Sequence, residues 1–295
     1  MTKTRENDVY LPGFMLSDNV VPSSSLKETV EKKEVIVSVC PSHIVRKIIN
    51  GIKIFLTDQT LIISASKGIE DNTLMTMSEV FESILSQTQL QKMSFLSGPS
   101  FAREVSNKLP TAVAIASHNR KAAEEAQQIL ATPYFRTYTS ADVKGIELGG
   151  AAKNVIAIAV GISDGLGLGH NTQAALITRG LREIIRLGEK MGADPLTFSG
   201  LSGMGDLVLT CTGKLSRNRS VGVSLGKGMR LNDILSNMSM VAEGVKTTRA
   251  IYQLSLKFNV EMPIIKQTNL VLYEGKSPQN AMKELMQRGL KHEME

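Results

Sequence analysis

The sequence predicts an α/β class with a mostly parallel sheet for its first half and an all-α class for its second half. Short β-branched runs alternate with helix-like segments up to about Thr139, which is the pattern of a parallel sheet flanked by helices. Beyond Thr139 the strand signals disappear, and helical periodicity takes over between glycine-rich turns. The change comes near Ser140 with little linker, so we expect a sheet domain over residues 1–140 and a helical domain over residues 141–295.

The sheet half contains short apolar runs that predict strands. They are Val35–Val39, Leu61–Ala65, Met93–Leu96, Thr111–Ala116 and Phe135–Thr139. Helix-like segments lie before and between these runs, and some of them have polar start signals such as Ser24, Ser25 and Asp71-Asn72. The predicted helices lie near Ser24–Lys33, Ser42–Ile54, Asn72–Gln87 and Arg120–Leu130.

The second half consists of apolar-periodic segments without strand signals. The predicted helices are Asp142–Leu166, Thr172–Met191, Pro195–Ser199, Asp206–Thr212, Arg217–Leu225, Leu231–Ser236, Glu243–Phe258, Pro263–Tyr273 and Pro278–Arg288.

The composition is that of an ordinary globular protein, with 42% hydrophobic and 21% charged residues. The formal net charge of +6 suits anionic small molecules as well as nucleic acid, but 4% aromatic residues and no tryptophan argue against nucleic-acid binding. No window approaches the roughly 18 apolar residues of a membrane span, and the N-terminus lacks the apolar core of a signal peptide, so we expect a cytoplasmic location. The two cysteines and four histidines are scattered, so we expect no metal site.

A single lysine, Lys153, and a single asparagine, Asn154, stand in the otherwise small and apolar helical stretch Glu147–Ile162. A buried ammonium must find a partner or lower its pKa, and a lysine that titrates near neutrality can accept and return a proton. The alternative is a lysine that extends from a helix end to water. Small neighbours leave room for a ligand, and no further charge appears until Asp164, which favours proton transfer.

Polar residues follow the predicted strands, at the edge of the sheet where ligands of parallel sheets bind. Lys67 closes one strand and would face the crevice, unless it is a solvated loop lysine. Gly98 and Ser100 follow the next strand at a predicted helix start and suit an anion, unless they form an ordinary helix cap.

The helical half has its densest polar cluster around Ser216, Arg217 and Asn218. A hydroxyl, a forked guanidinium and an amide together suit the oxygens of a phosphate, although a helix cap with solvated charges explains the same residues. Asp206 reads as an N-cap, unless its carboxylate turns to the amine of Lys153.

Seven short motifs follow one another along the chain, each modest by itself. They are Ser66-Lys67-Gly68-Ile-Glu70, Ser97-Gly98-Pro99-Ser100-Phe-Ala102, Leu148-Gly-Gly-Ala-Ala-Lys153-Asn154-Val-Ile-Ala157, Asn171-Thr-Gln-Ala-Ala-Leu-Ile-Thr-Arg179-Gly180, Gly205-Asp206-Leu-Val-Leu-Thr210-Cys-Thr212, Ser216-Arg217-Asn218-Arg219 and Val241-Ala-Glu243-Gly244. This ordered set resembles the NAD(P)-dependent glycerol-3-phosphate dehydrogenases of the bacterial type, over nearly the whole chain from about Tyr10 onward.

The resemblance implies a Rossmann domain, a helical substrate domain, and an enzyme that interconverts sn-glycerol 3-phosphate and dihydroxyacetone phosphate with NAD or NADP for phospholipid synthesis. It implies that Lys153 is the catalytic proton acceptor. The implied substrate-binding residues are Lys67, Gly98, Ser100, Lys153, Asp206, Ser216, Arg217 and Asn218. The implied cofactor-binding residues are Lys67, Ala102, Arg217, Val241 and Glu243. Lys67 and Lys153 are then expected to meet across the cleft, where two cations lower each other's pKa.

The sequence departs from the family at its start. Family members begin with a strand, a Gly-x-Gly-x-x-Gly turn and a helix, and nothing of this kind precedes Val35. The spaced glycines of Gly165–Gly169 and Gly200–Gly205 lie in the helical half, so they do not supply this turn. We therefore expect an incomplete Rossmann-type parallel sheet without the usual pyrophosphate cradle, and the choice between NAD and NADP stays open.

Two hypotheses follow. The first is the glycerol-3-phosphate dehydrogenase that the resemblance implies. A 3-hydroxyacid or sugar-acid dehydrogenase would be a close relative with similar chemistry. The cluster around Arg217 favours a phosphorylated substrate over these. The second is a catalytically impaired or inactive remnant that at most binds phosphate esters or partner subunits. A homodimer would be unsurprising in either case.

Overall fold

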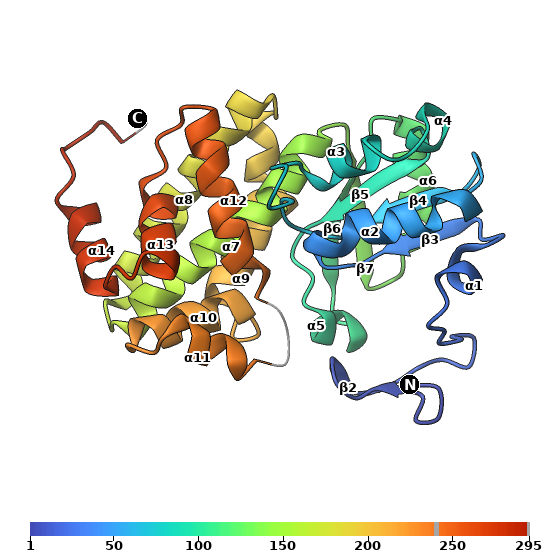
Figure 1. Cartoon of the computed structure of the whole chain (residues 1–295), viewed down its shortest axis with the longest axis horizontal. Helices are drawn as coiled ribbons and strands as arrows, with labels where there is room; N and C mark the ends of the chain where they lie inside the picture. Colours follow the sequence, from blue (N-terminus) through green and yellow to red (C-terminus); the bar gives the residue numbers. More distant parts are fainter. Residues whose placement is uncertain (239–241, 294–295) are drawn as a thin grey trace.

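The structure is a computed structural model that describes residues 1–238 and 242–293. Its first half is built on a five-stranded sheet in which the strands follow one another in chain order (Figure 1). The strands are β3 (Val35–Ser38), β4 (Leu61–Ser64), β5 (Met93–Ser97), β6 (Thr111–Ala116) and β7 (Phe135–Ser140). Neighbouring strands are parallel except β5 and β6, which are antiparallel. Each predicted strand is confirmed to within one residue at either end.

Helices cover both faces of the sheet. The helices of this half are α1 (Leu26–Val30), α2 (Ser42–Ile52), the 3₁₀ turn η1 (Lys53–Phe55), α3 (Met77–Glu82), α4 (Gln87–Leu90), α5 (Ala102–Ser106) and α6 (Arg120–Leu130). Because side chains of a strand alternate between faces, Leu61 and Ile63 of β4 pack in the core with α6, whereas Ile62 packs in the core with α2 and α3. The predicted α/β class of this half is confirmed.

The second half is a bundle of helices around α7 (Val143–Gly165), which α8, α9, α10, α12 and α13 contact (Figure 1). Its elements are α8 (Gly169–Met191), η2 (Pro195–Ser199), the π-helical turn η3 (Leu201–Gly205), α9 (Asp206–Thr212), α10 (Arg217–Gly226), α11 (Leu231–Ser236), α12 (Glu243–Lys257), α13 (Pro263–Tyr273) and α14 (Pro278–Met286). All described elements after Ser140 are helical, as predicted.

The helix α7 corrects one expectation from the sequence. It is long and apolar enough, by length and composition, to cross a membrane, but its whole apolar window is buried inside the molecule. Its role in the structure is that of a central core helix, which is apolar on all sides because other elements surround it.

The predicted helix Asn72–Gln87 was too long at both ends. Leu74 has a φ of 60°, which is outside the helical region, and α3 begins only after Thr76. Thr76 and Glu79 form a capping box at this start, and Ser86 and Gln89 form another at the start of α4. The apolar periodicity continues across both capping boxes, so it did not reveal that this segment contains separate short helices.

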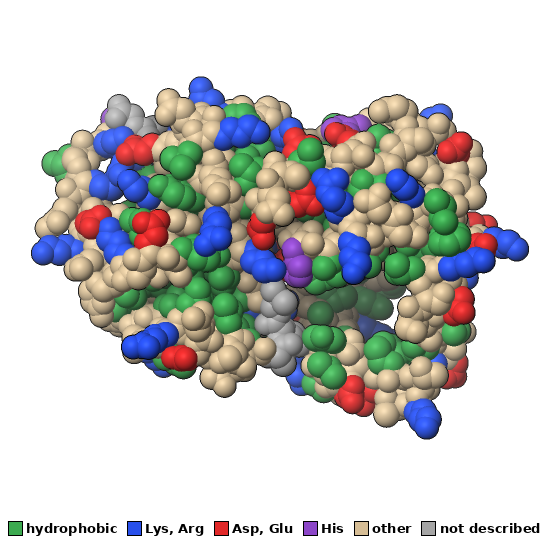
Figure 2. All heavy atoms as spheres, in the orientation of Figure 1, with side chains coloured by type: hydrophobic (Ala, Val, Ile, Leu, Met, Phe, Trp, Pro, Cys, Tyr) green, Lys and Arg blue, Asp and Glu red, His purple; other side chains and the backbone are tan. Residues whose placement is uncertain are grey.

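The N-terminal segment contains a small hairpin that the sequence pattern did not predict. Its strands are β1 (Glu6–Asn7) and β2 (Leu11–Met15), which pair with each other and not with the main sheet. Figure 2 shows a hollow with hydrophobic side chains between the sheet half and this segment. Strand β3 is an edge strand of the sheet, and Val37 and Val39 are 49% and 69% exposed there.

Candidate active site

Two lysines meet on one buried carboxylate, where the ends of β4 and β5 face α7 and α9. Lys67 follows β4, and its Nζ donates to Asp206 Oδ2 at 2.7 Å and to the carbonyl of Gly98 at 3.1 Å. Lys153, in the middle of α7, donates to the other oxygen of the same carboxylate, Asp206 Oδ1. The structure therefore brings Lys67 and Lys153 together as expected. Asp206 makes no capping bond to α9, so its interpretation as an N-cap was wrong.

Lys153 is only 7% exposed, so the alternative of a lysine that reaches water does not hold. Its Nζ also donates to the hydroxyl of Thr210 at 2.8 Å. Burial, and next the neighbouring Lys67, lower the pKa of Lys153 to about 8, although the attraction of Asp206 opposes them. A lysine with this pKa exists in both protonation states near neutral pH, which is what a general acid–base group requires.

Asp206 keeps its charge although it is only 1% exposed. Burial opposes ionisation, but Lys67 and Lys153 together outweigh it and hold the pKa of Asp206 below its usual value. The carboxylate thus partly offsets two ammonium charges at the centre of the cluster.

Two glycines allow the close approach of α7 to the strand ends. A Cβ at Gly150 would lie 2.5 Å from Ser97 Oγ and 3.6 Å from Lys67 Cδ, so any larger residue would push the helix away. Gly98 has a φ of 142°, a conformation that favours glycine, and it turns the chain after β5 so that its carbonyl faces Lys67.

A cavity of about 190 Å³ opens beside the lysines. It is lined by Lys67, Ser100, Phe101, Lys153, Asn154, Thr210, Leu215, Ser216, Arg217, Asn218 and Glu243. The volume suits a small metabolite, because drug-sized ligands occupy about 300–1,000 Å³. Most of the predicted substrate residues therefore line one cavity. Gly98 and Asp206 do not line it, but both accept hydrogen bonds from Lys67, which does.

The predicted phosphate cluster has both structural and cavity-lining roles. Ser216 is the N-cap of α10, where its Oγ accepts from Arg219 N at 3.2 Å, so the helix-cap interpretation holds for this residue. Asn218 donates to Asn154 Oδ1 at 2.8 Å and accepts from Gly244 N at 3.0 Å, which joins α10 to α7 and α12. Arg217 is exposed and lines the cavity.

Not all of the predicted cofactor residues line the cavity. Glu243 opens α12, lines the cavity and accepts from Ser42 N at 3.4 Å, at the start of α2. Burial raises the pKa of Glu243, against the hydrogen bond from Ser42. Ala102 begins α5 but is exposed and does not line the cavity. Val241 lies outside the described residues.

The cavity lies at the edge of the sheet where ligands of parallel sheets bind. The ends of β3, β4 and β5 lie at one edge of the sheet, because these strands are parallel, and Lys67 and Glu243 border the cavity there. None of the strand-to-helix turns in the described part of the chain has the Gly-x-Gly-x-x-Gly sequence that cradles a pyrophosphate.

Two polar residues that line the cavity, Asn154 and Thr210, were not assigned to the site from the sequence. Thr210 lies one helical turn after Asp206, so both face Lys153 from α9. Asn154 is adjacent to Lys153 and orients Asn218. The spacing of four residues between Asp206 and Thr210 was the available signal for Thr210.

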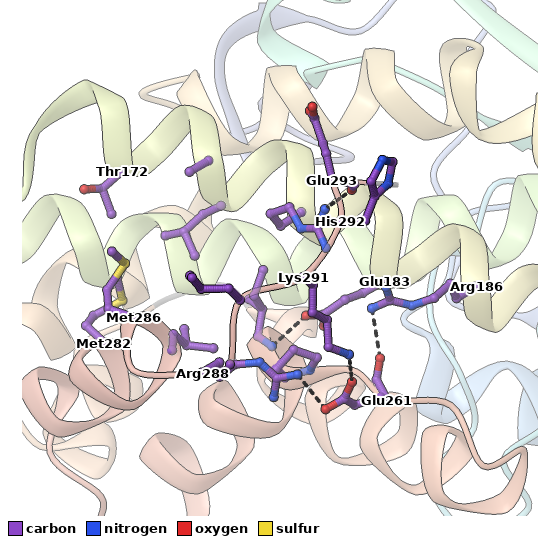
Figure 3. A pocket seen from close by; sticks show the side chains of 18 of the residues that line it. Thr172, Glu183, Arg186, Glu261, Met282, Met286, Arg288, Lys291, His292 and Glu293 are labelled. Carbon is purple, nitrogen blue, oxygen red and sulfur yellow. Dashed lines mark hydrogen bonds and ion pairs between the residues drawn. The ribbon is translucent and has the colours of Figure 1, made fainter. Parts of the chain in front are cut away.

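A larger cavity of about 540 Å³ lies away from the lysines, between α8, α14 and the segment 287–293 (Figure 3). Glu183 of α8 borders it and is only 1% exposed; its carboxylate accepts from Ile264 N and Ile265 N at the start of α13. Burial raises the pKa of Glu183 to about 7. None of the predicted site residues lines this cavity, and its walls are largely apolar.

Comparison with known proteins agrees with this geometry. Two family models match: NAD-dependent glycerol-3-phosphate dehydrogenase N-terminus over residues 1–123 and C-terminus over residues 142–283. A curated glycerol-3-phosphate dehydrogenase [NAD(P)+] of Syntrophotalea carbinolica is 54% identical over 295 residues, which are 100% of this chain and 89% of the relative.

Solved structures agree as well. The glycerol-3-phosphate dehydrogenase of Coxiella burnetii superposes with a TM-score of 0.93 at 38% identity, covering 98% of this chain and 87% of that chain. The glycerol-3-phosphate dehydrogenase of Saccharomyces cerevisiae superposes with a TM-score of 0.80 at 25% identity, covering 96% of this chain and 84% of that chain.

Proposed function

Because the chain belongs to the NAD-dependent glycerol-3-phosphate dehydrogenase family, we propose that it interconverts sn-glycerol 3-phosphate and dihydroxyacetone phosphate, using NAD or NADP. The observation that carries this proposal is a lysine with a pKa of about 8 at a small cavity that also presents an arginine, a serine and an asparagine. The product of reduction, glycerol 3-phosphate, suits a role in phospholipid synthesis. A cytoplasmic location and a homodimer remain predictions from the sequence.

Lys153 is the proposed proton-transfer group. In the oxidation direction, neutral Lys153 takes the proton of the C2 hydroxyl while C2 loses hydride; in reduction, the ammonium returns this proton to the carbonyl oxygen. The nicotinamide, when bound, accepts or supplies the hydride. Asp206 and Thr210 hold Nζ in place, and burial, together with the neighbouring Lys67, keeps the pKa of Lys153 low.

Arg217 and its neighbours are the proposed phosphate site. The guanidinium can donate two parallel hydrogen bonds to phosphate oxygens, and Ser216 and Asn218 lie at the same wall of the cavity. The proposed cofactor-binding residues are Lys67, Ala102, Arg217, Val241 and Glu243. Gly98 and Ser100 are proposed to bind substrate from the end of β5, where Ser100 Oγ donates to the carbonyl of Gly98 at 3.1 Å.

The direct test is a spectrophotometric assay of purified residues 1–295 with NADH or NADPH and dihydroxyacetone phosphate. Consumption of reduced cofactor that depends on dihydroxyacetone phosphate is expected, with unphosphorylated dihydroxyacetone as a poor substrate. Binding of glycerol 3-phosphate without turnover would support the alternative of a protein that binds phosphate esters without catalysis. No binding of either phosphate ester would contradict both.

A further inference from the structure

Glu147 is a buried carboxylate on the same helix as Lys153, and the proposed reaction does not use it. It is 8% exposed. Its two oxygens accept from the backbone N of Ser78 at 2.7 Å and from Ser78 Oγ at 2.5 Å. Ser78 lies in the first turn of α3, so this carboxylate joins α7 to a helix of the sheet half.

Glu147 and Lys153 border the same contact between α7 and the strand ends. Glu147, Gly150 and Lys153 are spaced three residues apart, which places them along one side of the helix over roughly 9 Å. Gly150, between them, lies against Ser97 Oγ and the Lys67 side chain. The position of α7 against β4 and β5 is thus held at one end by Glu147 and at the other by the lysine–Asp206 cluster.

A small cavity, with a wall that is mostly apolar but carries several hydroxyl groups, lies between Glu147 and Lys67. It has a volume of about 10 Å³, which is near the minimum for one water molecule, and both residues line it. Three serine hydroxyls also line it, those of Ser64, Ser66 and Ser97, and none of the three has a hydrogen-bond partner among the described residues. Buried hydroxyls without a partner are costly, and a water molecule would satisfy them.

We propose that Glu147 is a positioning residue: through Ser78, and through one water held by these serines, it fixes α7 at the depth at which Lys67 and Lys153 share Asp206. The catalytic consequence of this positioning rests on the proposed function, whereas the contacts of Glu147 do not depend on it. Replacing the side chain would let α7 shift against the strand ends, and the spacing of the two ammonium groups would change with it.

The charged groups around Glu147 are few. Glu79 of α3 is the neighbouring acid and pairs with Lys144 of α7 at 3.1 Å, while Lys67 lies across the small cavity. Burial raises the pKa of Glu147 to about 7, although both hydrogen bonds from Ser78 favour the charged form. Either protonation state can accept from Ser78, so Glu147→Gln should retain the link that Glu147→Ala loses.

Glu183 offers a matched control. It is also buried, at 1% exposed, accepts from backbone N–H groups at a helix start and has a similar pKa of about 7, but it lies in α8 away from the lysines. Glu183→Ala should therefore lower stability as Glu147→Ala does, without changing the lysine cluster.

The experiment measures how fast acetic anhydride labels Lys67 and Lys153 in the full chain between pH 6 and 10, with mass spectrometry as the readout. Glu147→Ala should change the labelling rate of Lys153 at pH 7 by about tenfold, the change that one pKa unit produces. Glu147→Gln should stay close to the wild type, and so should Glu183→Ala. A crystal structure should show one water within hydrogen-bond distance of Ser97 Oγ.

Equal labelling rates of Lys153 in Glu147→Ala and Glu183→Ala would overturn the proposal. A crystal structure without a water molecule in the small cavity would overturn it as well. If Glu147→Ala does not fold, Ser78→Ala removes one of the two bonds and should change labelling in the same direction; no change would again overturn it. Labelling needs no cofactor or turnover, so an inactive wild-type chain would count against the proposed function alone. Where turnover is measurable, Glu147→Ala should reduce kcat by about 10–100-fold with a smaller effect on KM.

Discussion

Lys153 combines burial, two oxygen acceptors and a neighbouring cation, and this combination sets its predicted behaviour. We expect Lys153→Met to lower turnover by about 10²–10⁴-fold, because general acid–base catalysis is lost, and to leave cofactor affinity nearly intact. The measurement is steady-state kinetics with calorimetry of cofactor binding. Lys144→Met is the control, since Lys144 lies on the same helix and pairs with Glu79 away from the cavity. Near-normal turnover of the Lys153 variant would remove it from the mechanism.

The pH profile should report the same residue. Oxidation of glycerol 3-phosphate requires neutral Lys153, so its rate should rise as pH increases through about 8, the pKa of Lys153. Reduction requires the ammonium and should fall over the same range. Rates measured in both directions from pH 6 to 10 test this, and two profiles with the same slope would contradict it.

Arg217 separates phosphate recognition from chemistry. We expect Arg217→Ala to raise KM for glycerol 3-phosphate strongly, since a charge-assisted hydrogen bond contributes about 1.5–3 kcal/mol, and to change the use of glycerol far less. Lys214→Ala is the matched control, because Lys214 is an exposed cation in the same loop that does not line the cavity. If both substrates are affected equally, Arg217 does not serve the phosphate.

Site residues could be predicted where the sequence places a charged side chain in surroundings that do not favour a charge. A charge in an apolar helix required a partner, which directed attention to Lys153 and offered Asp206 as one solution. The sequence could not decide between Asp206 as a cap and Asp206 as an ion-pair partner, because the choice depends on how α9 is oriented against α7. Glu147 was overlooked as a site residue because its partner, Ser78, is 69 residues away in sequence.

At the scale of elements, the crossing of α7 and α10 depends on glycines. A Cβ at Gly161 would overlap the backbone carbonyl of Arg219 and lie 3.0 Å from the Cα of Gly222. We expect Gly161→Ala to destabilise the fold by about 1–3 kcal/mol, as overpacking does, measured by urea denaturation. Gly51→Ala in α2 is the contrasting variant: its Cβ would meet only Leu26 Cδ1 at 3.4 Å, so it should stabilise by about 0.5–1 kcal/mol. Equal effects of the two substitutions would contradict this account of the crossing.

Element prediction succeeded where burial and local pattern agree. The apolar run Leu61–Ser64 is buried along its whole length, which is why it is read correctly as a strand. The hairpin of β1 and β2 escaped prediction because it is short and partly exposed and carries no alternating pattern. The antiparallel pairing of β5 and β6 is also invisible locally, since it depends on the direction in which the chain returns after α5.

At the scale of the whole molecule, the buried carboxylates Glu147 and Glu183 make stability depend on pH through their raised pKa values. Burial raises the pKa of Glu147 and of Glu183 from 4.5 to about 7. The folded state therefore binds these two protons more tightly than the unfolded chain does. Their contribution to stability is fully present below about pH 4.5 and is lost as pH rises through about 7.

Glu183→Gln isolates one of these two contributions without touching the lysine cluster. The glutamine does not titrate, so the variant should gain stability relative to the wild type as pH rises from 5 to 8. The gain should be on the order of 2–3 kcal/mol, because one pKa unit corresponds to about 1.4 kcal/mol and the shift spans more than two units. The measurement is the free energy of unfolding in urea at both pH values. A difference between variant and wild type that stays constant with pH would show that Glu183 is ionised in the folded protein at pH 5, and that the hydrogen bonds from Ile264 and Ile265 outweigh its burial.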